Sequence, residues 1–241
     1  GLEVIAYNIN RKQSDLRLFE FGKNYFRQGD KYVEKLRLSL FVTGNSSKET
    51  WQHKTQKVAF HHLAGEVQKV IRRLSKEKIS RHELHGHTIF EYGLSLKLGT
   101  KEICILGKIK NSISARFGVK QEIFYSDIEW NLLLPKRNNN IVYKEISKYP
   151  EVKRDLSLVI DKNISFEEIK AIAERTEKKY IKEINVFDVY EGERIDASKK
   201  AYALSFILQD NERTLTDKVI DKTMKKLMSA FENEANAHIR Q

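Results

Sequence analysis

Strand-like and helix-like patterns follow one another in a fixed order through residues 156–239, and this order constrains the fold more than any other feature. In chain order the predicted segments are strand Leu156–Ile160, a helix from Ser165, strands Ile184–Tyr190 and Ala201–Gln209, a helix containing Ile220, Met224, Leu227 and Phe231, and a short strand with Ala235, Ala237 and Ile239. A β-α-β-β-α-β order is typical of the ferredoxin-like fold.

Two details sharpen this prediction. A capping box is expected at the start of each helix, because Ser165 is followed three residues later by Glu168, and Thr214 by Asp217. Along the strand before the second helix, alternate side chains fall on one face, which we expect to be buried: Tyr202, Leu204, Phe206 and Leu208.

The preceding 140 residues are patterned mainly as strands. Apolar or alternating runs predict strands at Leu2–Tyr7, Leu16–Phe21, Leu36–Val42, Ile89–Leu98, Glu102–Ile109 and Ile123–Leu134. One helix is expected at residues 55–74, where apolar residues form a single stripe. A sheet with a covering helix is an α+β arrangement. The segment Pro135–Asn140 consists of poor strand formers and predicts a linker between a domain at 1–140 and a domain at 144–241.

The formal net charge of +11 lies entirely in the first domain. Residues 144–241 contain 19 Lys/Arg and 19 Asp/Glu, so residues 1–143 hold 25 Lys/Arg and 14 Asp/Glu. A positive balance favours contact with a polyanion such as nucleic acid. The densest basic run is Arg72-Arg73 with Lys76, Lys78 and Arg81. A solvated helix end is preferred for this run over contact with RNA phosphates.

The class of protein is limited by what the chain lacks. Its single cysteine, Cys104, excludes a disulfide framework and lies in an apolar run, so it is interpreted as a buried side chain. No apolar stretch approaches the ~20 residues that span a bilayer, and no signal-peptide pattern is present, so no membrane contact is expected. We expect a reducing, cytoplasmic compartment.

The sequence gives only weak signals for catalytic or metal-binding residues. His82, His85 and His87 cluster, but their spacing matches no common zinc motif, and an exposed loop or strand edge is preferred. The chain also has no Gly-x-Ser-x-Gly elbow, Walker loop or nucleotide-binding glycine triplet. We therefore predict no catalytic residue and no metal ligand.

Candidate RNA contacts lie in the second domain. Single-stranded RNA is recognised by aromatic or arginine side chains on an open sheet and by polar residues at strand and loop edges. The polar candidates are Lys153, Arg154, Lys199, Lys200 and Arg213. An alternative for Arg154 is an internal pair with Asp155. About half of the strand aromatics are expected in the core whatever the function.

Three motifs of the second domain carry a family resemblance: Tyr149–Leu158, Phe187–Gly192 and Asn211–Asp217. In this order they resemble the ferredoxin-fold anticodon-binding domain that ends the beta subunit of bacterial phenylalanyl-tRNA synthetases. Ala237–Arg240 is similar to the short last strand of that family. The resemblance implies a domain that contacts the anticodon region of phenylalanine tRNA.

Residues 1–140 resemble the preceding catalytic-like module of the same subunit. Gly1–Asn10 and Leu18–Tyr25 are similar to its segment corresponding to motif 2 of class II synthetases, and Phe124–Trp130 to a later strand. The resemblance implies a class II synthetase-like antiparallel sheet without a working site. Such a site needs two arginines on one ATP. Arg27 superficially fills the first position, and Asn131–Leu134 offers nothing for the second.

Because the chain begins with glycine, we expect a fragment of a longer, non-catalytic beta subunit. The resemblance implies that it supports the alpha subunit of an alpha2beta2 enzyme, which charges phenylalanine tRNA using ATP and Mg²⁺. It implies no cofactor in this fragment, and no activity of the fragment alone. The alternative is a stand-alone protein-interaction or regulatory module with a ferredoxin-like fold and no RNA binding, which the neutral charge of residues 144–241 favours.

Overall fold

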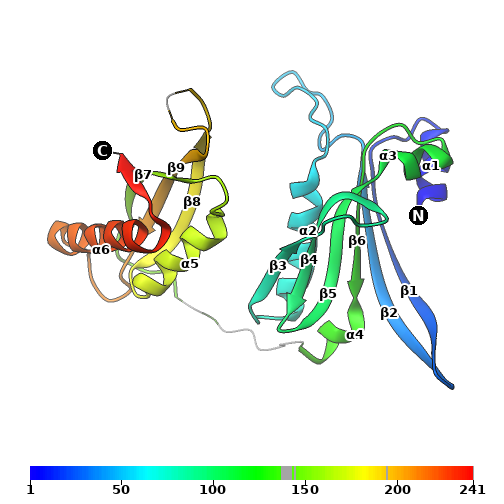
Figure 1. Ribbon diagram of the computed structural model, residues 1–241, viewed down its shortest axis with the longest axis horizontal. Helices are drawn as coiled ribbons and strands as arrows, with labels where there is room; N and C mark the ends of the chain where they lie inside the picture. The colour runs from blue at the N-terminus through cyan, green and yellow to red at the C-terminus, as the bar shows by residue number, and fades with distance from the viewer. Residues whose placement is uncertain (137–142, 144, 194, 241) are drawn as a thin grey trace. The chain divides into compact units, whose positions relative to one another are not determined.

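The chain divides into two compact units, Gly1–Ile141 (unit 1) and Val142–Gln241 (unit 2) (Figure 1). The computed structural model describes residues 1–136, 143, 145–193 and 195–240. Each unit has its own buried apolar core. The first two residues of the expected linker Pro135–Asn140 complete a short 3-10 helix, Leu134–Lys136, and residues 137–140 lie outside the described residues.

Unit 1 is built on a six-stranded sheet in which every neighbouring pair is antiparallel. Its strands are β1 (Leu16–Gln28), β2 (Lys31–Thr43), β3 (Ile79–Glu83), β4 (Phe90–Leu98), β5 (Lys101–Ile109) and β6 (Ile123–Glu129). Their order across the sheet is β1-β2-β6-β5-β4-β3, so β1 and β3 are the edges. The hairpin of β1 and β2 extends past the end of β6, because β6 pairs with β2 only from Arg37 to Thr43.

Helices cover both faces of this sheet. Helix α2 (Phe60–Leu74) packs over β2, β5 and β6 and buries three residues spaced four apart, Leu63, Val67 and Ile71. The short helix α1 (Leu2–Ile9) belongs to a second apolar cluster, in which Ile5 is fully buried. The remaining helical turns are α3 (Asn111–Ser114), a 3-10 turn (Ala115–Phe117) and α4 (Trp130–Leu133).

The expected strand Leu2–Tyr7 is wrong, because this segment forms helix α1. Its apolar residues recur with the helical period and pack into one cluster: Leu2, Ile5, Ala6 and Ile9. A short apolar run does not distinguish a strand from a buried helix, and tertiary packing decides between them.

Two expected boundaries in unit 1 are also wrong. The strand Ile123–Leu134 ends at Glu129, because the following residues form α4, whose Leu133 is fully buried. The strand Leu16–Phe21 does not stop at Gly22 but continues through it, because the whole of β1 is paired with β2. Pairing with a neighbouring strand therefore outweighs the local preference of glycine.

Unit 2 has the expected β-α-β-β-α-β order. Its elements are β7 (Val152–Asp161), α5 (Phe166–Thr176), β8 (Ile181–Tyr190), β9 (Lys199–Leu208), α6 (Asp217–Ala235) and β10 (His238–Arg240). The antiparallel sheet has the order β10-β7-β9-β8, which confirms the ferredoxin-like prediction. The closing strand is shorter than expected, since α6 continues through Ala235.

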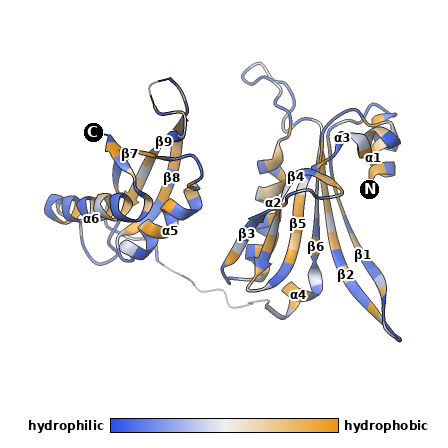
Figure 2. Ribbon diagram, viewed as in Figure 1, coloured by the Kyte–Doolittle hydropathy of each residue, from blue (hydrophilic) through white to orange (hydrophobic). Residues whose placement is uncertain are grey.

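One face of the unit 2 sheet packs against α5 and α6. The expected buried row of β9 is confirmed, with every member no more than 7% exposed: Tyr202, Leu204, Phe206 and Leu208. In Figure 2 the strands of this sheet carry most of the hydrophobic residues, whereas the visible side of α6 is mainly hydrophilic.

The two expected capping boxes have different outcomes. The box of α5 is confirmed, because the Ser165 hydroxyl accepts the Glu168 N–H at 3.2 Å and the Glu168 carboxylate accepts the Ser165 N–H at 2.6 Å. The box of α6 is wrong. Asp217 is already the first helical residue, and the N-cap is Thr216, whose side chain makes no capping bond.

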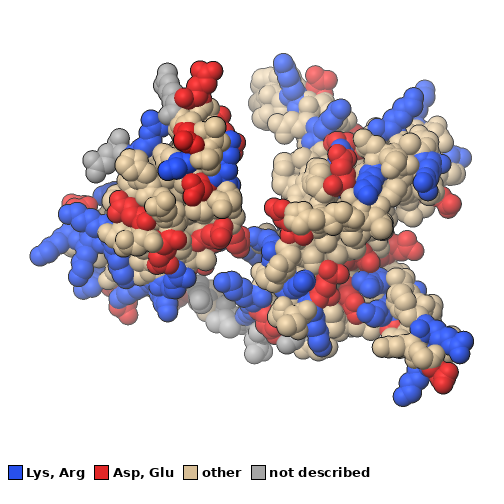
Figure 3. Space-filling view, viewed as in Figure 1, with Lys and Arg blue, Asp and Glu red and all other residues tan. Residues whose placement is uncertain are grey.

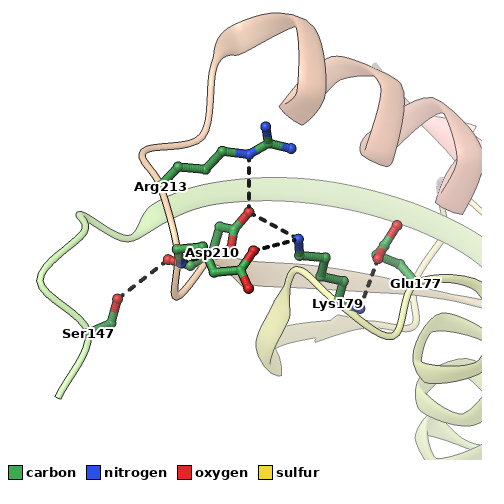
Figure 4. A network of polar contacts seen from close by, with 6 residues as sticks. Ser147, Glu177, Lys179, Asp210 and Arg213 are labelled. Atoms are coloured by element: carbon green, nitrogen blue, oxygen red, sulfur yellow. Dashed lines mark hydrogen bonds and ion pairs between the residues drawn. The ribbon is translucent and has the colours of Figure 1, made fainter. Parts of the chain in front are cut away.

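Three loops at one end of the unit 2 sheet meet at Asp210 (Figure 4). Its side chain is 1% exposed, and its carboxylate lies 3.5 Å from Nε of Arg213 and 3.6 Å from Nζ of Lys179. The carboxylate also accepts the Glu212 N–H at 3.0 Å, and the Asp210 carbonyl accepts the Ser147 hydroxyl at 3.4 Å. The backbone hydrogen bond from Glu212, followed by the positive charges, holds the pKa of Asp210 below its usual value.

We expect Asp210→Asn to destabilise unit 2 at neutral pH, because it removes the charge that the two cations and the Glu212 N–H stabilise. A carboxylate with a lowered folded pKa stabilises the fold above its unfolded pKa of about 3.9 and loses that contribution as pH falls through the folded pKa. The urea midpoint of the variant should therefore depend less on pH below about pH 5 than that of the wild type. Hydrogen exchange of the β9 amides, followed against urea concentration at each pH, gives this midpoint for unit 2.

The control is Asp221→Asn, which removes an exposed carboxylate from α6. Its midpoint should follow the wild-type pH dependence. An Asp210→Asn protein that also follows the wild-type curve would contradict the role given to the buried carboxylate.

Candidate nucleic-acid interface

The face of the unit 2 sheet opposite α5 and α6 carries exposed polar and aromatic side chains. On β7, Leu156 and Leu158 are buried against the helices. Since side chains alternate along a strand, Lys153 and Asp155 point to the opposite face, and both are exposed. We call this side the open face.

The centre of the open face is lined by short side chains. On β9 three of the residues that alternate with the buried row are small: Ala201, Ala203 and Ser205. Ala203 pairs with Ser157 of β7 on one side and Asp188 of β8 on the other, whereas Ile207, the next member of this set, pairs with Lys153. The short side chains of this floor are Ser157, Ala201, Ala203 and Ser205. Such a floor leaves taller neighbouring side chains free to contact a flat ligand.

Phe187 is the tall side chain beside this floor. Strand β8 has a register shift between Val186 and Asp188, and Phe187 is the extra residue. Bulges of this kind re-aim a side chain. The Phe187 ring is 55% exposed, and the Lys153 ammonium lies 5.6 Å from its centre, reaching across β9. An exposed ring close to a cation suits a planar base attached to a phosphate.

The sequence-predicted residues Lys153 and Arg154 lie side by side on β7 but point to different faces. Arg154 donates to the Lys153 carbonyl at 3.0 Å and lies 3.9 Å from Asp217 at the start of α6. Asp155 pairs with Lys153 at 3.6 Å. The alternative interpretation, an internal Arg154–Asp155 pair, is therefore not the arrangement found in the structure.

The other candidates lie elsewhere in unit 2. Lys199 and Lys200 are at the start of β9, opposite the end of β7, and so at the far end of the sheet from Lys153. Lys200 is 9% exposed, donates to the Lys162 carbonyl at 2.9 Å and lies 4.8 Å from the ring centre of Tyr202. Arg213 belongs to the Asp210 network (Figure 4). The structure thus separates the five residues into two groups at opposite ends of the sheet.

Phe187 begins the motif Phe187–Gly192, but the polar candidates were preferred over the strand aromatics, and the sequence did not indicate which aromatics face the open side. Strand periodicity predicts which residues share a face, but the shift at Val186–Asp188 changes the phase along β8. A glycine or other bulge marker is absent from this segment, so the sequence gives no signal for the shift.

In unit 1, the charged residues on the sheet face opposite α2 pair with one another. Arg37 lies 3.4 Å from Asp127 and 3.5 Å from Glu129. Burial raises the pKa of Asp127, and the Arg37 guanidinium opposes this rise. Arg27 lies near the tip of the β1–β2 hairpin, 3.6 Å from Asp30. Each of these two arginines therefore faces a carboxylate of its own unit.

The remaining candidates of unit 1 are dispersed. Among the described residues, no group of three or more His, Cys, Asp or Glu side chains is placed to hold a metal ion. His82 lies on the edge strand β3, 3.1 Å from the Ser80 hydroxyl, and His87 Nδ1 faces the backbone N–H groups of Ile89 and Phe90. Cys104 is buried, as expected, and burial raises the pKa of its thiol.

The basic run at 72–81 spans an element boundary. Arg72 and Arg73 occupy the last turn of α2, where cations complement the helix dipole, and Arg81 lies on β3. The preferred interpretation of this run, a solvated helix end, and the alternative, contact with RNA phosphates, both stay predictions. No helix in the described part of the chain is long and apolar enough to cross a membrane.

Two family matches cover most of the chain. Residues 1–130 match the family described as the phenylalanyl tRNA synthetase beta chain CLM domain. Residues 147–240 match the ferredoxin-fold anticodon binding domain. The boundary between the two matches falls in the same part of the chain as the boundary between the two structural units.

Curated relatives bear the name of the same synthetase subunit. The phenylalanine–tRNA ligase beta subunit of Bacteroides thetaiotaomicron is 42% identical over 255 aligned residues, covering 100% of this chain and 31% of that protein. The Bacteroides fragilis subunit is 39% identical with the same coverage. The chain thus spans about a third of the length of these curated relatives. Among solved structures, pyrrolysyl-tRNA synthetase from Desulfitobacterium hafniense is 12% identical, with a TM-score of 0.42 over 55% of this chain and 45% of that one.

The first family match extends over more than half of the chain, and the six-stranded antiparallel sheet of unit 1 lies within it. The second match covers the complete βαββαβ sheet of unit 2. The chain belongs to the phenylalanyl tRNA synthetase beta chain family.

Proposed function

We propose that this chain is part of the non-catalytic beta subunit of phenylalanine–tRNA ligase. In this proposal unit 2 binds the anticodon region of phenylalanine tRNA, and unit 1 supports the catalytic alpha subunit in a cytoplasmic alpha2beta2 enzyme. The relatives bear the name of this ligase subunit, and the match over residues 147–240 bears the name of an anticodon-binding domain.

The open face of unit 2 is the observation that carries the RNA-binding part of the proposal. Single-stranded loops are bound by stacking their bases on exposed aromatic rings and by placing cations near their phosphates. Phe187 and Lys153 supply one ring and one cation above a floor of short side chains. Arg154 and Arg213 flank the same end of the sheet, whereas Lys199 and Lys200 flank the other.

ATP, Mg²⁺ and phenylalanine are proposed to bind the alpha subunit. The engaged arginines of unit 1 support this division, because Arg37 is held by two carboxylates and Arg27 lies near a hairpin tip. The 241-residue chain alone should not charge phenylalanine tRNA. Phenylalanylation by the isolated chain would contradict the assignment of catalysis to the alpha subunit.

An aromatic row on β1 supports a partner-binding role for unit 1. The residues facing the same side as α2 are exposed on this strand, with Phe19 at 71% and Tyr25 at 65%. Phe21, half exposed, packs edge-to-face against Trp130 at 4.9 Å. Exposed aromatic clusters of this kind mark protein-binding surfaces, where aromatic residues are enriched. We propose that the alpha subunit covers Phe19, Phe21 and Tyr25.

We expect Phe187→Ala to weaken binding of the anticodon stem-loop of phenylalanine tRNA. Loss of one base–aromatic stack costs about 1–3 kcal/mol, which is roughly a 5- to 150-fold rise in Kd. Fluorescence anisotropy with labelled RNA at fixed salt measures the change. Val189→Ala is the control, because Val189 is exposed on the same strand but pairs with Tyr202 on the helix side.

Equal Kd values for wild type and Phe187→Ala would show that Phe187 of the open face does not contact the RNA. Binding that instead depends on Arg72, Arg73 and Lys76 would place the RNA contact in unit 1. No binding at low salt by the wild-type chain would favour an interaction module without RNA binding, an alternative that fits the neutral charge of residues 144–241.

We expect Phe19→Ser combined with Phe21→Ser to weaken association with the alpha subunit of the source organism. Truncating central aromatic contacts typically costs about 2 kcal/mol or more, which is roughly a 30-fold rise in Kd. Sedimentation velocity of mixtures measures the complex. Tyr7→Ser, an exposed aromatic on α1, is the control. Undiminished association of the double variant would place the interface elsewhere on unit 1.

A further inference from the structure

Residues 45–57, which we call the Trp51 loop, lie between β2 and α2 and project away from the sheet of unit 1 (Figure 1). Trp51 lies at the tip of this loop and is 92% exposed. It is the only apolar residue of the loop. A single exposed apolar side chain is common on protein surfaces, so exposure by itself does not indicate a site. The backbone and the charged side chains around Trp51 decide whether it belongs to a binding surface.

Hydrogen bonds fix the backbone of the Trp51 loop at its neck and at its tip. At the neck, a β-bridge joins the two sides, and the Ser46 N–H donates to the Gln56 carbonyl at 2.8 Å. At the tip, the Thr50 N–H donates to the His53 carbonyl at 3.0 Å, and the His53 N–H donates to the Thr50 hydroxyl at 3.1 Å. An ordered loop loses little conformational entropy when it binds, so Trp51 is presented to a partner at low cost.

Exposed lysines lie on both sides of Trp51. Lys48 and Lys54 are each three residues away from it, so their Cα atoms lie at most about 11 Å from that of the tryptophan. Lys57 lies at the neck, and Glu49 is the one acidic residue of the loop. Within the described residues, no ion pair joins these three exposed lysines to a carboxylate. Figure 3 shows Lys and Arg side chains at the outer end of this projection, next to uncharged ones.

A recess of about 250 Å³ lies on the same loop, and polar side chains line it: Ser47, Gln52, His53, Lys54 and Gln56. Hydroxyl and amide groups both donate and accept hydrogen bonds, as the edges of nucleotide bases and the ribose hydroxyl do. The recess has no apolar lining residue, so it does not suit an apolar side chain of a protein partner.

A nucleic acid fits these features better than a protein does. The centre of a protein interface is apolar, and lysine is depleted there. Unpaired RNA bases, in contrast, stack on exposed aromatic rings, while lysines bind the phosphates beside them. The positive balance of the chain also lies in residues 1–143, which contain the Trp51 loop, and not in residues 144–241.

We propose that the Trp51 loop is a second RNA contact, in which Trp51 stacks on an unpaired base of the bound tRNA and Lys48 and Lys54 bind the phosphates on either side of that base. This inference rests on the proposed binding of phenylalanine tRNA. It goes beyond that proposal, which places the RNA on the open face of unit 2, because it gives unit 1 a contact of its own.

The first test follows the fluorescence of Trp51 in the complete 241-residue chain. The chain has two tryptophans, so Trp130→Phe leaves Trp51 as the only one. Phenylalanine tRNA should quench the emission, because stacking on a base quenches the indole ring. A fully base-paired RNA duplex should quench it much less, since its bases are not free to stack on a side chain. Equal quenching by the two RNAs, or none by the tRNA, would overturn the proposal.

Substitution of Trp51 separates base stacking from docking in an apolar pocket. Trp51→Leu keeps an apolar side chain but lacks a ring, and should raise the Kd for the tRNA about 5- to 150-fold. Trp51→Phe keeps a ring and should bind nearly as the wild type does. Fluorescence anisotropy with labelled tRNA at fixed salt measures both, and circular dichroism should show unchanged stability, because Trp51 is almost fully exposed.

A wild-type Kd for Trp51→Leu would overturn the stacking role. Weaker association of Trp51→Ala with the alpha subunit in sedimentation velocity, at an unchanged Kd for the tRNA, would also overturn it and place Trp51 in a protein interface. A silent Trp51→Leu together with a persisting effect of Phe187→Ala would overturn the contact in unit 1 alone. Absence of tRNA binding by the wild-type chain would overturn both RNA contacts.

The lysines are tested by the salt dependence of tRNA binding. Lys48→Gln combined with Lys54→Gln should reduce the slope of log K against log salt by about 1.4, because each phosphate contact of a single strand contributes about 0.7. The control is Lys31→Gln combined with Lys101→Gln. These lysines begin β2 and β5, which run in the same direction, whereas the Trp51 loop follows the other end of β2. Equal losses in the two double variants would show a diffuse charge effect and overturn the phosphate contacts.

Discussion

The pairing of β9 with β7 and β8 is the constraint on which the architecture of unit 2 depends. Strand β9 is paired on both sides along most of its length, so the phase of its side chains is fixed. One set, from Tyr202 to Leu208, closes the apolar core under the helices. The other set contains the small Ala203 and Ser205, and it forms the floor of the open face. A shift of one residue would exchange the two sets and lose both the core and the floor.

Much of this arrangement follows from the sequence, and the reason is physical. Long elements with a clear period and a local cap, such as α5 with its Ser165–Glu168 box, are determined by contacts close in the chain. The segment Leu2–Ile9 and the end of β6 are determined by packing against distant residues, and neither was predicted correctly. The α6 start shows the same limit, because a Thr214–Asp217 spacing does not decide which residue becomes the N-cap.

The candidate interface was less accessible to sequence reasoning than the fold. Lys153 and Phe187 are 34 positions apart in the chain, and they meet only because β9 lies between their strands and a register shift re-aims Phe187. Lys200 looks like a surface cation in the sequence, yet it is buried against a carbonyl and a tyrosine ring. Charge counts identify which unit is basic, but pairing within the fold decides which cations remain available to a ligand.

The edge position of β1 has a consequence for the free chain. Its outer backbone groups face away from β2 along a strand of 13 residues, and aromatic side chains lie beside them. An edge of this kind is a template for pairing with another copy, and exposed aromatic residues strengthen such pairing. Solubility of the free chain should therefore depend on whether this edge is covered. In the proposed pairing with the alpha subunit, the amounts of the two proteins have to be matched because of this one strand.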